Sequence, residues 1–112
     1  MADPIPPITL PPSEDLAQEA EWLQGALGRW LDHQFIPETI NQAIAARATQ
    51  VYVRQRMEGE DDLGGIVIAI VLELKSFDFS ESFFGEFPVA NAVSELLLDR
   101  LGIEPCCDWE RT

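Results

Sequence analysis

The chain has 112 residues, a formal net charge of −13 at pH 7, and a hydrophobic share of 46%. This length fits one domain, and this apolar share is enough to build a buried core without disulfide staples. A strongly negative surface repels phosphate backbones and anionic headgroups, which argues against nucleic acid and membrane surfaces as partners. A neutral or basic protein surface suits the charge better, although excess acid also has a simpler interpretation as an aid to solubility.

The first predicted unit is an extended arm over residues 1–12. These residues hold five of the eight prolines. Proline lacks a backbone N–H and fixes its own backbone angle, so the arm should lack regular hydrogen bonding and could be laid across the core. The segment has neither the basic residues nor the continuous apolar stretch of a secretory signal, so we expect a cytoplasmic protein.

Two amphipathic helices are predicted next. Ser13 is a suitable N-cap for the first, which should run to about Gln34 with apolar residues at three- and four-residue intervals. Pro37 suits the first turn of the second helix. On that helix Arg47 and Arg54 are seven residues apart and should share a face, where they either pair with surplus acids or receive a partner's carboxylate.

Residues 63–77 fit two structures. As a strand over 65–75, alternate residues would be apolar and β-branched, but no second strand is evident, so this reading needs pairing across a dimer. As a helix, with Asp61 or Asp62 as the cap, the segment has a regular apolar stripe. We favour the helix, and because its other side is also apolar we expect it to be buried nearly all round. The predicted stripe is Leu63, Ile66, Val67, Ile70, Leu74 and Phe77.

The last predicted helix begins at Pro88 and ends before Gly102, a suitable C-terminal cap. Its predicted apolar stripe is Val89, Val93, Leu96, Leu97 and Leu101. The expected fold is therefore all-α: a single compact domain of four helices packed around a central third helix, over residues 13–104. Residues 105–112 would form a short tail. This tail includes the adjacent cysteines Cys106 and Cys107, whose role is left open.

Five of the six phenylalanines lie within residues 76–87. Phe77 extends the third helix and Phe87 precedes Pro88, so both should face the core. Two interpretations remain for Phe79, Phe83 and Phe84, either as a plug at the end of the bundle or as a groove for a partner's apolar side chain. In the second case Tyr52, Arg47 and Arg54 would complete a protein-binding surface.

No catalytic constellation is evident. The single histidine, His33, has no companion nucleophile in any local motif, and residues 63–66 lack the lysine and the spacing of a phosphate-binding loop. One histidine and two adjacent cysteines fall short of the roughly four ligands of a structural metal site. We therefore expect a protein that is not an enzyme and that needs no cofactor or metal. The longest apolar run, residues 66–72, is too short to span a membrane.

Three segments resemble small acidic cyanobacterial proteins of the CcmS-type carboxysome assembly factors: QVYVRQRMEGEDDLGG at 50–65, SFDF at 76–79 and FPVANAVSELLLDRLG at 87–102. The resemblance covers about residues 13–107 and transfers no individual binding residue. It implies an assembly chaperone that binds a flexible C-terminal extension of a carboxysome shell protein. The alternative is a small assembly factor or structural subunit of a photosynthetic membrane complex. The partner's identity and a possible homodimer stay open.

Overall fold

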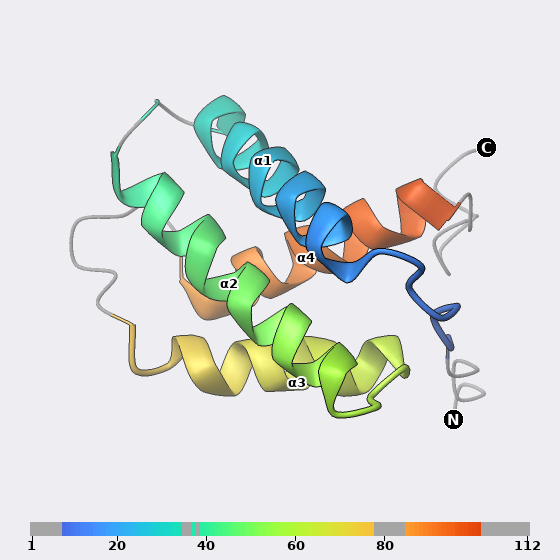
Figure 1. Ribbon diagram of the computed structural model, residues 1–112. Coiled ribbons are helices and arrows are strands. Elements are labelled where there is room, and N and C mark those ends of the chain that lie inside the picture. Colours follow the sequence, from blue (N-terminus) through green and yellow to red (C-terminus); the bar gives the residue numbers. More distant parts are fainter. Residues whose placement is uncertain (1–7, 35–36, 38, 78–84, 102–112) are drawn as a thin grey trace, which may run out of the picture.

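A computed structural model describes residues 8–34, 37, 39–77 and 85–101. Its four helices are α1 (Leu16–Gln34), α2 (Thr39–Met57), α3 (Leu63–Leu74) and α4 (Glu86–Leu101). Helices consecutive in the chain run antiparallel (Figure 1). The only β pairing within the described ranges is one isolated bridge, between Thr9 and Asp62. The all-α prediction is therefore confirmed.

The first helix begins two residues later than a Ser13 cap would require. The backbone N–H of Gln18 donates to Asp15 Oδ1 at 3.1 Å, which is the contact of an N-cap residue with the third residue of its helix. Asp15 is thus the cap. The Ser13 hydroxyl instead donates to Glu19 Oε2 at 2.9 Å and ties the incoming chain to the first turns of α1.

The core lies where the inward faces of the helices meet, and the predicted apolar stripes supply it. Gly28 of α1 is buried against α2, where an added Cβ would lie 3.0 Å from Gln42 Oε1, so a larger residue there would displace the Gln42 side chain. The fully buried large side chains include Leu23, Leu27, Leu31, Ile44, Val51, Tyr52, Ile66, Ile70, Leu74, Val89 and Val93.

The third helix is a helix and not a strand. Asp62 caps it, because its Oδ2 accepts the Gly65 backbone N–H at 3.0 Å. Four residues of the predicted stripe are buried: Leu63, Ile66, Ile70 and Leu74. The alternative strand over 65–75 is therefore wrong, since the helix satisfies its own backbone groups without a neighbouring chain.

The predicted central position of this helix is also wrong. α2 and α4 each lie against all three other helices, whereas α1 and α3 are on opposite sides of them (Figure 1). Two neighbours on one side of a helix cannot cover its whole circumference. Consequently Ile68 and Leu72 are 61% and 60% exposed, although the sequence predicted burial nearly all round.

The last helix begins at Glu86, before the predicted start at Pro88. Its buried residues Val89, Val93 and Leu97 match the prediction. Phe87 does not: its side chain is 61% exposed, because the helical turn places it about 200° from Val89. Phe77 packs against the core as predicted, but it does not extend α3, which ends at Leu74. The predicted cap Gly102 lies outside the described residues.

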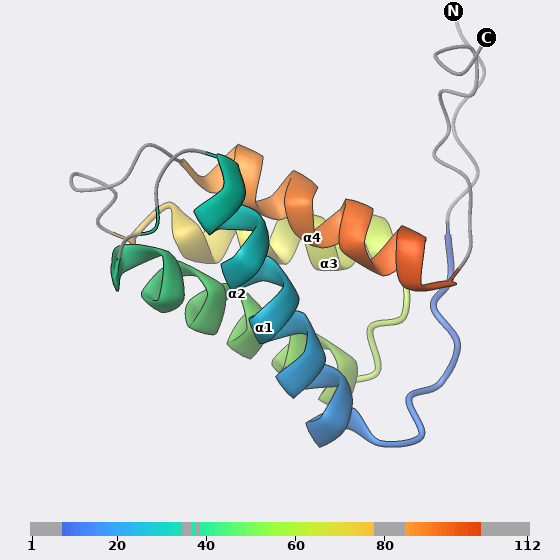
Figure 2. The same cartoon turned by 90° about the horizontal axis from the view of Figure 1, so that it is seen from above.

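The described part of the N-terminal arm pairs with the loop between α2 and α3 (Figure 2). The Leu10 N–H donates to the Asp61 carbonyl at 2.7 Å, and the Leu63 N–H donates to the Ile8 carbonyl at 2.8 Å. Leu10 is buried in the core. The expected lack of regular hydrogen bonding is thus wrong for residues 8–10, which contain no proline and keep their donors.

Candidate protein-binding site

Three of the six predicted contact residues, Phe79, Phe83 and Phe84, lie outside the described residues. The two interpretations of that segment, core plug and contact surface, both stay open as predictions. The structure places the other three, Tyr52, Arg47 and Arg54, all on α2.

Tyr52 differs from its predicted position on a contact surface. Its side chain is fully buried, and its hydroxyl donates to Glu19 Oε1 on α1. The ring therefore belongs to the contact between α1 and α2. Because it is fully buried, Tyr52 is a core residue in this fold.

Arg47 and Arg54 do share a face, and both reach the same carboxylate. Arg47 Nε lies 3.5 Å from Glu73 Oε2, and Arg54 Nη2 lies 3.3 Å from Glu73 Oε1. The arginine side chains are 40% and 52% exposed. Arg47 Nε forms an ion pair with Glu73 but no hydrogen bond, because it has no hydrogen-bond partner among the described residues. Two guanidinium groups thus share one carboxylate, which leaves local positive charge on a strongly acidic chain.

A groove between α1 and α2 adjoins this arginine pair. Its volume is about 610 Å³, and Arg54 forms part of its border. Met57, which is 75% exposed, and Val53 provide apolar side chains from α2, and Ala20 faces them from α1. Sequence reasoning missed this groove, since it depends on how closely two helices pack. The lining residues are Ala20, Gln24, Thr49, Gln50, Val53, Arg54, Met57 and Glu58.

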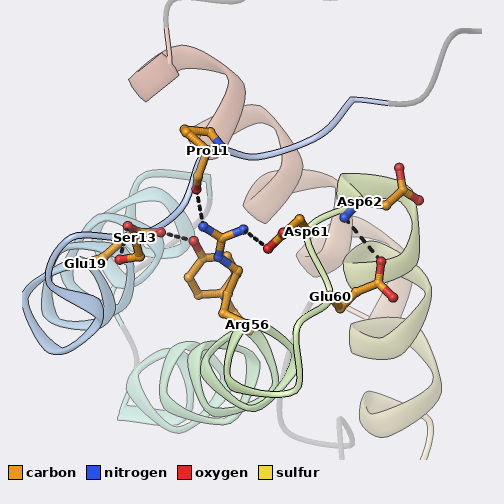
Figure 3. A network of polar contacts seen from close by, with 8 residues as sticks. Pro11, Ser13, Glu19, Arg56, Glu60, Asp61 and Asp62 are labelled. Atoms are coloured by element: carbon orange, nitrogen blue, oxygen red, sulfur yellow. Dashed lines mark hydrogen bonds and ion pairs between the residues drawn. The ribbon is translucent and has the colours of Figure 1, made fainter.

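A second polar cluster surrounds Arg56, near the end of α2 (Figure 3). Arg56 Nη1 lies 2.9 Å from Asp61 Oδ1, and Arg56 Nη2 donates to the Pro11 carbonyl. The Arg56 side chain is only 4% exposed. The cluster therefore ties the arm to α2 and to the loop before α3, and we assign it a structural role. A cleft of about 420 Å³ lies beside it.

The described ranges also bear on two other kinds of site. No three His, Cys, Asp or Glu side chains in these ranges come together in a way that could hold a metal ion. None of the helices in the same ranges is both long enough and apolar enough to cross a bilayer.

Comparison with known proteins gives a family without a described activity. No curated protein and no solved structure matches the chain significantly. One family model matches residues 4–101, a range that includes all four helices and most of the N-terminal arm. The chain belongs to the family described as "Domain of unknown function (DUF8822)".

Proposed function

We propose that the protein is a non-enzymatic adaptor or assembly chaperone that binds a peptide segment of another protein. The observation that carries this proposal is the apolar groove between α1 and α2, bordered by an arginine that shares a single carboxylate with a second arginine. Exposed apolar surface beside polar groups is typical of protein contacts.

The groove and the arginines would recognise different parts of the segment. An apolar side chain would enter between Ala20, Val53 and Met57. A carboxylate of the segment, such as its own C-terminus, would pair with Arg54, which is half exposed. The whole chain has a net charge of −13, so its acidic surface would favour basic residues elsewhere in the segment.

The resemblance to CcmS-type factors supplies a candidate segment, the C-terminal extension of a carboxysome shell protein. The family model carries no functional description, so it does not bear on this choice. An adaptor of this kind would act in the cytoplasm, where a shell protein is assembled.

The test is a calorimetric titration of the full chain with a peptide of that extension. We expect Arg54→Ala and Met57→Ser each to weaken binding about ten- to a hundredfold, because contact arginines and apolar anchors often dominate binding energy. Arg29→Ala and Phe87→Ser are matched controls, since both residues are exposed and lie outside the groove lining. Amidating the C-terminus of the peptide should weaken binding to the parent chain by the same factor as Arg54→Ala does.

Two results would contradict the proposed site. One is parental affinity in both Arg54→Ala and Met57→Ser. The other is an equal loss in the matched controls, which would indicate nonspecific attraction. Phe83→Ala belongs in the same series, with thermal melting beside the titration: a variant that binds weakly but melts normally supports a contact role, and one that only unfolds supports a core plug.

A further inference from the structure

α3 has apolar side chains on all sides, yet it packs against only two helices. Its outward side carries Ile68 and Leu72, which are 61% and 60% exposed. They are four residues apart and therefore lie one turn apart on the same face. Within Leu63–Leu74 the only charged residue is Glu73, and it points toward Arg47 and Arg54 of α2. The outward face of this helix is thus free of charge.

Such a face is unusual for a helix of a soluble domain. A helix that is hydrophobic all round is normally buried, and contiguous apolar patches on a protein surface mark contacts. It is also unusual for this chain, whose net charge is −13. Two copies of the chain repel each other over most of their surface, and they do so least where the acids are missing.

The charges at the two ends of α3 indicate what covers this face. The acidic segment Glu58, Glu60, Asp61 and Asp62 precedes the helix, and the exposed Lys75 follows it. An antiparallel neighbour with the same sequence would place its Lys75 beside this acidic segment, whereas a parallel one would bring two acidic segments together. In a twofold arrangement the favourable contact forms twice.

We propose that the outward face of α3, with Ile68 and Leu72 at its centre, binds the same face of a second copy in an antiparallel, twofold homodimer. Gly64 is exposed and lies one turn before Ile68 on the same face, and because it has no side chain it lets the second helix approach closely there. Antiparallel helices also oppose their dipoles favourably. This interface is separate from the groove between α1 and α2 and does not depend on the function proposed for it.

Sedimentation equilibrium of the full chain over a range of concentrations tests the proposal. We expect a concentration-dependent dimer. Leu72→Glu should raise the dimer dissociation constant at least about a hundredfold, because twofold symmetry buries two unpaired carboxylates per substitution. Circular dichroism should stay unchanged, since the side chain is exposed in the single chain. Met57→Glu is the matched control: it makes the same charge change at another exposed apolar residue and should leave the dimer intact.

A second pair of variants tests the antiparallel orientation. Lys75→Glu and Arg29→Glu each make the net charge more negative by two, so general repulsion between copies rises equally in both. Only Lys75 lies at the proposed contact, so Lys75→Glu should raise the dissociation constant about tenfold more than Arg29→Glu does.

A chain that stays monomeric at every concentration would overturn the proposal and leave the α3 face to a different protein. So would a dimer that survives Leu72→Glu. Equal effects of Lys75→Glu and Arg29→Glu would overturn the antiparallel arrangement.

Discussion

Arg54 and Arg56 stand two residues apart on α2, yet their surroundings differ. The Arg56 side chain is 4% exposed and binds both Asp61 and the Pro11 carbonyl, which belong to different segments. Arg54 is 52% exposed and shares Glu73 with Arg47. A buried guanidinium must have its partners, since losing them leaves a charge out of water, whereas an exposed one can exchange partners at little cost. This difference separates a structural arginine from one available for binding.

The largest expected effect comes from removing the structural arginine. Arg56→Ala should lower the free energy of unfolding by about 2 to 3 kcal/mol, because it releases the arm from α2 and removes packed side-chain atoms. The half-exposed Asp61 keeps the loss below that of a fully buried pair. Urea unfolding followed by circular dichroism measures it. Arg54→Ala is the control and should change stability by less than about 0.5 kcal/mol; equal losses would erase the distinction between the two arginines.

Much of the interior could be predicted from the sequence, since it depends on local spacing. The inward stripes of α3 and α4 are correct because apolar residues at helical intervals identify a face that must be covered. The same reasoning failed on the outer side of α3. A helix without a polar face gives no sign of which side its neighbours will cover. Here α2 and α4 cover one side of α3, and α1 packs away from it. Phe87 was placed wrongly because the start of α4 moved by two residues.

The binding surface was less predictable for a related reason. Arg47 and Arg54 were placed on one face correctly, since the seven-residue spacing fixes it. Tyr52 stands among the same arginines in the sequence, but it is buried and its hydroxyl donates to Glu19, 33 residues earlier in the chain, a contact that local spacing does not reveal. The groove between α1 and α2 is a property of two packed helices, and no periodicity within one of them reports it.

A smaller loss of stability is expected when the Tyr52 hydroxyl is removed, and it tests whether Tyr52 has a structural role like that of Arg56. Tyr52→Phe keeps the buried ring but removes the hydroxyl that donates to Glu19. It should lower the free energy of unfolding by about 1 to 2 kcal/mol, as expected for a hydrogen bond to a charged group, and it should leave peptide affinity unchanged. Denaturant unfolding and calorimetric titration measure the two quantities. Lower affinity with unchanged stability would return Tyr52 to the contact surface and contradict its assignment to the core.

The smallest expected change in stability comes from replacing Glu73. For this variant the informative result is whether the peptide binds more tightly or more weakly. Glu73→Gln removes the carboxylate that Arg47 and Arg54 share, yet these contacts are partly exposed, so stability should fall by less than about 1 kcal/mol. If the arginines receive a partner's carboxylate, Glu73 competes with it, and the variant should bind the peptide severalfold more tightly. The gain should disappear with an amidated peptide. Glu95→Gln on α4 makes the same charge change at an exposed residue and should show no gain. Unchanged or weaker binding by Glu73→Gln would mean that the arginines serve only to hold α2 against α3.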